Sequence, residues 1–400
     1  MTRLEGQDWL TSSATTAVFD ALEAAGGPDS ARFVGGSVRN ALVGRPVDDF
    51  DVATRLKPEE SMAALKAAGI KVVPTGIAHG TITAVSERKP YEITSLRCDV
   101  KTDGRRAVVA FTDDWAEDAA RRDFRLNALY ADRTGAIFDP TGQGVEDALA
   151  GRVVFVGDPN TRIEEDYLRI LRFFRLFAWY GGSDADAEGL AACAAHASGL
   201  TRLSAERVSK ELMKLLAAPD PRAAIHAMRD AGVLERLFPA VSGLGAFDAL
   251  SAASDDPVLR LSALLPDDPA AAADIARGLR LPRAIERRLA AAAGGPLDPT
   301  TGERELRALI YRLGKEAVSD RIRRGGGLQP QADTAPALAL IERWPVPRLP
   351  VGGRDLAKMG FEPGPGHGLI LKAFEAEWIA DDFPADGHQA RLTRLAKRPF

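Results

Sequence analysis

Residues 32–54 read RFVGGSVRNALVGRPVDDFDVAT, and this strand–turn–helix–strand pattern decides the fold of the amino-terminal part. The apolar run before the glycine pair predicts a strand over 31–34. The segment after it predicts a helix over 37–43 that a glycine and a proline end. Val, Ala and Thr then predict a second strand over 51–54. Because strand-like alternation returns in HGTITAVSE and YEITSLR, we expect a small α+β domain of roughly 100–150 residues.

The turn between the first strand and the helix is suited to binding phosphate. Gly35 and Gly36 lack side chains, so the free backbone N–H groups at the helix start can approach a triphosphate closely. Arg39, one turn into the helix, can add a forked cationic contact to phosphate oxygens. These three residues are therefore candidate triphosphate ligands.

Two aspartates, Asp49 and Asp51, stand one residue apart at the start of the second strand. Strand geometry projects both carboxylates to one face, with Asp48 on the other. Carboxylate oxygens suit Mg²⁺, and two ions about 4 Å apart can activate an attacking hydroxyl and stabilise a leaving pyrophosphate. Asp-x-Asp is also common in solvated acidic turns, but the upstream phosphate-binding turn favours a metal site. Glu92 in YEITSLR is either a third carboxylate of this site or an exposed strand residue.

A second polar cluster lies in ARRDFRLNALYAD, within a segment expected to be mainly helical over 115–130. Arg122 can bind phosphate. Asp123 and Asn127 can meet ribose hydroxyls, which would select ribonucleotides. The alternative is structural, with Arg122 and Asp123 merely capping a helix and forming ion pairs.

A third cluster lies in RIEEDYLRILRFFRLF, residues 162–177. Arg169, Arg172 and Arg175 recur every three residues, which predicts one helical stripe with Asp166 on the same face as Arg169. An Asp acceptor beside an Arg donor matches the Watson–Crick edges of cytosine and adenine, whereas guanine and uracil present the reverse order. The structural alternative is a set of i,i+3 ion pairs worth about 0.3–0.5 kcal/mol each.

Beyond the head, apolar residues recur at helical spacing and predict a helical array, including helices over 204–216 and 221–231. Glycines at 325–327 and prolines over 345–350 are candidate linkers. Asp103 and Gly104 mark a turn inside a charged loop.

Composition excludes several classes of protein. A net charge of −4 argues against a protein that coats nucleic acid indiscriminately. Cys98 and Cys193 form neither a disulfide framework nor a thiolate zinc motif, and the amino terminus lacks a secretory signal pattern. We expect a cytoplasmic protein without a membrane span. The five histidines include no His-Asp dipeptide, so we expect no phosphohydrolase site.

The segments GGSVRN, DFD, RRDF-x-x-N, DPTGQGVEDALAGR and EEDYLRILR follow one another in the order typical of class II tRNA nucleotidyltransferases. This family contains the CCA-adding enzymes and bacterial poly(A) polymerases. The resemblance covers about residues 30–240, including SAERVSKELMKLL, and weakens afterwards.

The resemblance implies an α+β fold with a polymerase-beta-like nucleotidyltransferase head and a mixed sheet over 1–150. All-helical parts are implied beyond it: a neck over 151–217 that recognises the base and binds RNA, a body over 218–345 and a tail over 346–400. The implied activity is template-independent addition of CMP, CMP and AMP to the 3′ end of tRNA from CTP and ATP.

The resemblance also implies roles for particular residues. Asp49 and Asp51 would hold two Mg²⁺ ions, and Glu92 would lie beside them. Asp166 and Arg169 would read the incoming base as a protein template. The full set of candidate nucleotide-binding residues is Gly35, Gly36, Arg39, Arg122, Asp123, Asn127, Glu165, Asp166, Arg169, Arg172 and Arg175.

Two residues depart from the family pattern. Asn40 stands where an Asp often follows the Val-Arg, and Arg125 replaces the usual Thr of RRDFT. We expect Arg125 to place an additional cation near the nucleotide. The charged loop around Asp103 belongs to a region that, in the family, helps the enzyme switch from C to A addition.

Two other functions remain open from the sequence. The nearer one is a poly(A) polymerase, or an enzyme that adds only C or only A. Bacterial poly(A) polymerases usually carry an additional basic signature after the catalytic strand, and KVVPTGIAHGTITAV lacks it. The more distant one is a non-catalytic RNA-binding protein, which the retention of Asp49, Asp51 and Arg39 disfavours.

Overall fold

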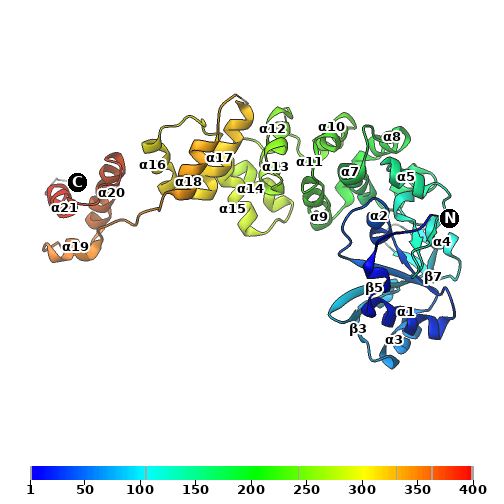
Figure 1. The fold of residues 1–400 in the computed structure, drawn as a ribbon. Helices are drawn as coiled ribbons and strands as arrows, with labels where there is room; N and C mark the ends of the chain where they lie inside the picture. Colours follow the sequence, from blue (N-terminus) through cyan, green and yellow to red (C-terminus); the bar gives the residue numbers. More distant parts are fainter. Residues whose placement is uncertain (1, 104–105, 242, 330, 362–363, 398–400) are drawn as a thin grey trace. The chain divides into compact units, whose positions relative to one another are not determined.

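The computed structural model describes residues 2–103, 106–241, 243–329, 331–361 and 364–397 (Figure 1). Its contacts divide the chain into two compact units, Met1–Pro239 and Ala240–Phe400. The first unit holds the mixed sheet and the second is helical, so the expected α+β fold is confirmed. Within the described residues, we find no helix with the length and apolar character to span a bilayer.

The main sheet has seven strands in the order β3-β4-β5-β2-β1-β8-β9. Its strands are β1 (Ala31–Val34), β2 (Phe50–Thr54), β3 (Lys71–Gly76), β4 (Thr81–Ser86), β5 (Lys89–Ser95), β8 (Tyr130–Ala131) and β9 (Ile137–Phe138). Strands β2 and β5 run parallel, whereas the other neighbours are antiparallel. The strands predicted on both sides of the glycine pair are therefore confirmed, and they lie side by side in the sheet.

Local sequence explains why the head helices begin and end where they do. The head helices are η1 (Asp8–Thr11), α1 (Ser13–Gly26), α2 (Gly36–Leu42), α3 (Pro58–Ala67) and η2 (Ile77–His79). Ser12 caps α1 by accepting from the backbone N–H of Thr15, and Pro58 opens α3. Helices α1 and α3 pack on each other beside β4 (Figure 1). Phe19 and Phe33, both fully buried, join α1 to β1 with ring centroids 4.7 Å apart.

The charged segment expected as a loop forms a second sheet, in which β6 (Arg97–Asp103) pairs antiparallel with β7 (Arg106–Phe111). Gly104 carried the turn prediction and lies outside the described residues, as does Arg105. The prediction of a loop is therefore wrong for the two flanking arms, whose strands satisfy each other's backbone groups.

The segment over 115–130 is mainly helical, as expected, but it does not form one continuous helix. Its helical residues belong to α4 (Trp115–Ala120) and the short η3 (Arg125–Asn127). Phe124 is extended, makes a β-bridge with Phe155, and is fully buried against that ring at 4.6 Å between centroids. Tertiary burial of Phe124 thus overrides the local helical preference.

The rest of the first unit is helical. Its helices are α5 (Gly144–Ala150), α6 (Pro159–Glu165), α7 (Leu168–Tyr180), α8 (Ala187–Ala195), η4 (Ala197–Arg202), α9 (Ala205–Leu216), α10 (Arg222–Asp230) and α11 (Leu234–Leu237). Arg169, Arg172 and Arg175 all lie in α7, as the helical stripe predicts, but the placement of Asp166 on the same helix is wrong, because the helix is interrupted between α6 and α7. Asp166 is extended, and the Tyr167 ring packs so closely on Gly199 that a Cβ at that glycine would lie 1.9 Å from it.

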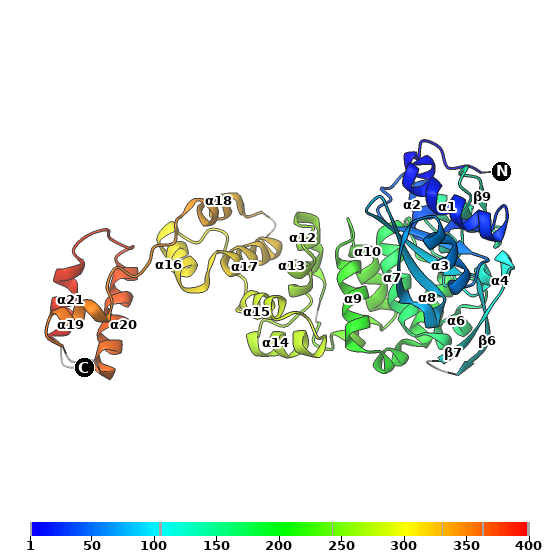
Figure 2. The same cartoon turned by 90° about the horizontal axis from the view of Figure 1, so that it is seen from below.

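The second unit consists of helices, several of which pack side by side (Figure 2). They are α12 (Gly245–Ala253), α13 (Pro257–Ser262), α14 (Pro269–Gly278), α15 (Arg283–Ala292), α16 (Glu303–Leu313), α17 (Lys315–Leu328), α18 (Ala335–Arg343), α19 (Gly353–Lys358), α20 (Pro365–Ala380) and α21 (His388–Ala396). The candidate linker over 345–350 is irregular, as expected. The candidate linker at 325–327 lies inside α17, so that prediction is wrong.

The glycines of α17 serve close packing. A Cβ at Gly325 would lie 1.7 Å from the carbonyl oxygen of Leu297. We therefore expect Gly325→Ala to lower the free energy of unfolding by about 3 kcal/mol, because overpacking exceeds the gain in helix propensity. Gly278→Ala is the control, since nothing lies within 4 Å of its Cβ position. Thermal or urea unfolding of both variants measures the difference, and equal stabilities would contradict the packing role.

Candidate active site

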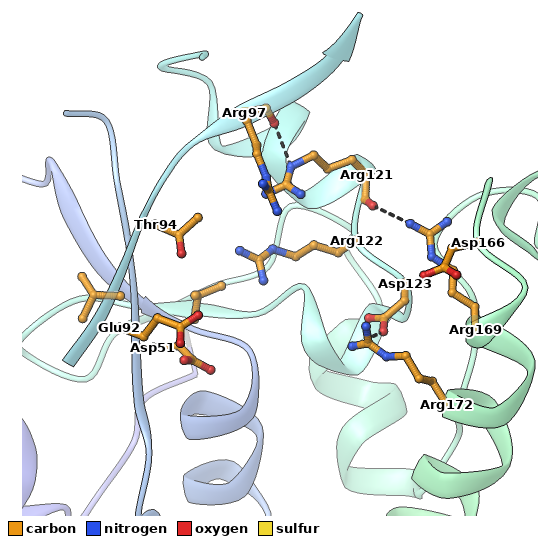
Figure 3. Close-up of a pocket in the computed structure, with 12 residues that line it drawn as sticks. Asp51, Glu92, Thr94, Arg97, Arg121, Arg122, Asp123, Asp166, Arg169 and Arg172 are labelled. Atoms are coloured by element: carbon orange, nitrogen blue, oxygen red, sulfur yellow. Dashed lines mark hydrogen bonds and ion pairs between the residues drawn. The ribbon is translucent and has the colours of Figure 1, made fainter. Parts of the chain in front are cut away.

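The first unit contains a cavity of about 410 Å³ that brings together residues from the main sheet, from β6, from the segment directly after α4, and from α7 and the residues before it (Figure 3). Asp51 and Glu92 lie at one end, and Asp166 and Arg169 lie at the other. The lining residues are Val34, Asp51, Val52, Glu92, Thr94, Arg97, Arg121, Arg122, Asp123, Asp166, Arg169 and Arg172. Asp49, Gly35, Gly36, Arg39, Asn127, Glu165 and Arg175 are outside this lining.

The sheet produces the acidic end of the cavity. Asp51 and Glu92 are direct neighbours in the parallel register of β2 and β5, so their side chains project to the same face. Burial and then the charge of Glu92 raise the pKa of Asp51 to about 6, with a further contribution from Asp49, although Arg122 and Arg39 oppose the shift. Asp49 is exposed, one residue before β2.

These carboxylates fit a divalent cation. Asp51 carries an unfavourable interaction with two other carboxylates, which a bound cation would neutralise. Among the described residues, no group of three or more His, Cys, Asp or Glu has metal-binding geometry. Mg²⁺ needs no such group, because it is commonly held by one or two carboxylates together with substrate phosphates and water.

The turn at Gly35 and Gly36 has the backbone conformation that the glycines were expected to provide. Gly35 has φ 70° and ψ −121°, a conformation that disfavours any residue with a Cβ. The Arg39 guanidinium is only 7% exposed, and it donates to Asn127, Asn40 and the Tyr180 hydroxyl while stacking 3.9 Å from the Tyr180 ring. Arg39 thus joins α2 to the end of α7, and its contact with triphosphate stays a prediction.

Asn40, the first departure from the family pattern, belongs to the same network. Its side-chain oxygen accepts from the Tyr180 hydroxyl at 2.9 Å and from Arg39 at 2.9 Å. Its amide donates to the carbonyl of Pro46 at 3.1 Å. The amide can therefore both accept and donate here, which an ionised carboxylate cannot do.

The orientation of Arg122 depends on a residue that sequence reasoning missed. Asp118 is 1% exposed, and its carboxylate accepts from Arg121 at 3.0 Å, from Arg122 at 2.9 Å and from the Tyr130 hydroxyl at 2.7 Å. Arg122 extends from this anchor toward Asp51 and Glu92 (Figure 3). The i,i+4 spacing of Asp118 and Arg122 was the available signal. Sequence reasoning also missed three polar lining residues, Thr94, Arg97 and Arg121.

We expect Asp118→Asn to lower the free energy of unfolding at pH 7 by about 3 kcal/mol, because it leaves two partly buried guanidinium groups without their anion. Burial would raise the pKa of Asp118, but Arg122, Arg121 and Tyr130 outweigh it and lower the pKa to about 2. A lowered carboxyl pKa stabilises the fold above the usual value of 3.8, and this stability is lost as the pH falls toward 2. Unfolding at several pH values should therefore show the two proteins converging in acid. A constant difference would contradict this ion pairing.

Asp123 lies at the cavity but is engaged by protein groups. Its carboxylate pairs with Arg172 at 2.6 Å and accepts from the Asn127 amide at 3.3 Å. Burial would raise the pKa of Asp123, but Arg172 and Asn127 outweigh it and hold the pKa below its usual value. The structure thus brings Arg122, Asp123 and Asn127 together without the helix that was expected to do so.

The arginine stripe of α7 divides between the cavity and α9. Asp166 and Arg169 line the cavity, as does Arg172. Arg175 instead pairs with Glu211 of α9 at 2.6 Å. Asp166 and Arg169 do not pair with each other among the described contacts, because each has another partner. The structural alternative is nevertheless met in part, since Arg162 and Glu165 form an i,i+3 ion pair and Glu165 also pairs with Arg169.

Arg125, the second departure, is not among the residues that line the nucleotide-sized cavity of about 410 Å³, and its place near the nucleotide stays a prediction. Its guanidinium donates to Gln143 and lies 3.6 Å from Asp147. It lines a separate cavity of about 250 Å³ with Thr141, Gln143 and Gly157. Arg125 opens the short η3, directly after the extended Phe124.

We expect Arg125→Thr to leave the KM for CTP and ATP unchanged and to lower the free energy of unfolding by about 1 kcal/mol, because Asp147 keeps its 2.8 Å pair with Arg152. Arg122→Thr is the comparison, since Arg122 lines the nucleotide-sized cavity. Steady-state kinetics with each nucleotide measures the effect. A raised KM in the Arg125 variant would restore this residue to the nucleotide site.

Comparison with known proteins agrees with this geometry. Two family models match: the poly A polymerase head domain over residues 31–154, and the probable RNA and SrmB-binding site of polymerase A over 186–244. The mitochondrial CCA tRNA nucleotidyltransferase 1 of Homo sapiens is 34% identical over 87% of this chain and 82% of its own length. The CCA-adding enzyme of Streptococcus gordonii is 33% identical over 92% of this chain and 93% of its own.

The crystal structure of the Bacillus stearothermophilus CCA-adding enzyme in complex with CTP matches with a TM-score of 0.77 and 25% identity, over 96% of each chain. The fold, the order of the motifs and the identity to relatives along most of both chains lead to the same assignment. This chain belongs to the CCA tRNA nucleotidyltransferases of the tRNA nucleotidyltransferase/poly(A) polymerase family.

Proposed function

We propose that this chain adds CMP, CMP and AMP in turn to the 3′ end of tRNA, using CTP and ATP and releasing pyrophosphate. One observation carries the proposal: a single cavity has carboxylates of β2 and β5 at one end and an Asp–Arg pair suited to cytosine and adenine at the other. The enzymatic relatives described above support the choice of reaction.

Asp49 and Asp51 would hold two Mg²⁺ ions, with Glu92 beside them. When bound, the metal would activate the attacking hydroxyl and stabilise the negative charge of the leaving pyrophosphate. Arg122, held by Asp118 and directed at Asp51, is placed to bind phosphate oxygens of the same nucleotide. Its fixed guanidinium would therefore orient the nucleotide without reorganising during the reaction.

At the other end, Asp166 would accept from the exocyclic amino group of the base and Arg169 would donate to the ring nitrogen. With uracil or guanine, the Asp166 carboxylate would face a carbonyl oxygen and the Arg169 guanidinium would face a ring N–H group. Each such unpaired contact costs about 1–3 kcal/mol. The base is thus chosen by the protein, and no nucleic acid template is needed.

The test uses purified protein, tRNA lacking its three terminal nucleotides, magnesium and each labelled nucleotide in turn. We expect two additions from CTP alone, one further addition when ATP is present, and none from UTP or GTP. Long adenylate tails would instead assign a poly(A) polymerase, and addition of only C or only A would assign a narrower enzyme. RNA binding without incorporation would assign a non-catalytic protein. The cytoplasmic location stays a prediction that cell fractionation can check.

A further inference from the structure

The two proposed base-reading residues are each held by another side chain. Asp166 pairs with Arg207 of α9, whose terminal nitrogen lies 2.6 Å from one carboxylate oxygen. The other oxygen accepts from the backbone N–H of Leu168 at 3.1 Å. Arg207 belongs to the SAERVSKELMKLL segment and is not among the residues that line the cavity. It therefore acts on the site through Asp166.

Arg169 is held separately on its own side. It pairs with Glu165, donates to the carbonyl of Arg162 at 2.7 Å, and approaches the carbonyl of Arg121 at 3.4 Å. Its side chain is only 14% exposed. The site thus has two ion pairs, one between Arg207 and Asp166 and one between Glu165 and Arg169. Asp166, the hydrogen-bond acceptor, and Arg169, the donor, both line the cavity without being paired with each other.

This separation matters because Asp166 and Arg169 carry opposite charges three residues apart. If these two side chains formed an ion pair with each other, they would satisfy each other's hydrogen-bonding groups. An incoming base would then have to break that pair before it could form its own hydrogen bonds. A cation on a different helix gives Asp166 another partner and leaves carboxylate lone pairs available, since an ionised carboxylate accepts about four hydrogen bonds.

We propose that Arg207 is a specificity-determining positioning residue: it keeps the Asp166 carboxylate apart from Arg169 and turned to accept from the amino group of cytosine or adenine. The proposal rests on the base-reading role of Asp166 in the proposed function. The packing of α9 against α7 provides the rigid support that fixes this contact.

The Arg207 side chain is 49% exposed, so its removal should cost the fold little. We therefore expect Arg207→Ala to fold normally and to lower kcat/KM for CTP and ATP on the order of tenfold, mainly through KM. The ratio of kcat/KM for CTP to that for UTP should fall on the order of tenfold as well. A mobile Asp166 carboxylate would no longer be fixed where it accepts a hydrogen bond from an amino group and disfavours a carbonyl group. Arg207→Lys should recover part of the ratio, since it keeps the cation but loses the planar fork.

Lys210→Ala is the matched control, because Lys210 is an exposed cation one turn along α9. It should leave all four nucleotide efficiencies unchanged. The measurement is kcat/KM for each of the four nucleotides at saturating tRNA, with KM for tRNA and thermal unfolding measured alongside.

Unchanged nucleotide ratios in Arg207→Ala would overturn the proposal, including the case in which only KM for tRNA rises, since that result would assign Arg207 to RNA binding. Equal changes in Lys210→Ala would also overturn it, because a general loss of positive charge would then suffice. Failure of the proposed function is distinguishable, as the unaltered protein would itself incorporate no CMP.

Discussion

Asp49→Ala and Asp51→Ala are each expected to reduce nucleotide incorporation at least about a thousandfold, because the lost carboxylate would remove a ligand of the ions that stabilise transition-state charge. The fold should survive both changes. Asp49 is exposed, and Asp51 carries an unfavourable interaction with Glu92 that truncation relieves. Rates at saturating magnesium, measured together with thermal unfolding, separate loss of activity from loss of structure.

Asp48→Ala is the control for this prediction. Asp48 is also exposed, stands next to Asp49, and is expected to project to the opposite face of the strand. Removing the Asp48 carboxylate should therefore change the local charge by the same amount as Asp49→Ala does, but leave the rate of nucleotide incorporation nearly normal. Near-normal turnover in Asp49→Ala or Asp51→Ala would refute the metal assignment, and a similar loss in Asp48→Ala would point to a general effect of charge.

Asp166→Ala is expected to relax discrimination, so that UTP and GTP compete with CTP and ATP. The efficiency with CTP and ATP should fall by about 1–3 kcal/mol of lost or unpaired hydrogen bonding, which is roughly 5- to 150-fold. Incorporation itself should continue, because Asp49 and Asp51 are untouched. The measurement is kcat/KM for each nucleotide.

Asp166→Asn sharpens this test because it preserves the shape of the side chain. An amide keeps one acceptor and adds a donor, so it should admit uracil and guanine while disturbing packing less than alanine does. A purely structural role, in which Asp166 only pairs with Arg207, predicts a different outcome: lower thermal stability with unchanged ratios among the nucleotides. Unchanged ratios in both variants would therefore reject the template hypothesis.

Local chemistry was enough to predict the strand–turn–helix–strand that carries the site. Strand β1 lies over the expected residues, and β2 begins one residue early. The conformation of Gly35 is one that favours glycine. These features depend on neighbours in the chain, namely alternation at period two and the freedom of glycine at positive φ, so the sequence contains the information directly. Family motifs added the order of the elements and the activity to be tested.

Contacts between distant segments decided the remaining features of the site. The register of β2 and β5 sets Glu92 beside Asp51, and burial of Asp118 fixes the direction of Arg122. The same applies to Arg207, which reaches Asp166 across 41 positions of sequence. Such pairings depend on which surfaces meet when the chain packs, and a helical period reports only on neighbours three or four residues apart.

The sequence by itself determined the α+β head, the helical remainder, the acidic pair and the glycine turn, because each arises from interactions within a few residues of chain. The tertiary structure alone decided that the helix is interrupted at Asp166, that Arg125 lines a separate cavity, and that the glycines near 325 lie inside a packed helix. In each of these three cases the deciding contact is with a residue at least 18 positions away: Gly199 against Tyr167, Gln143 with Arg125, and Leu297 against Gly325. Close packing against such distant groups outweighs local preferences that amount to about 1 kcal/mol per residue or less.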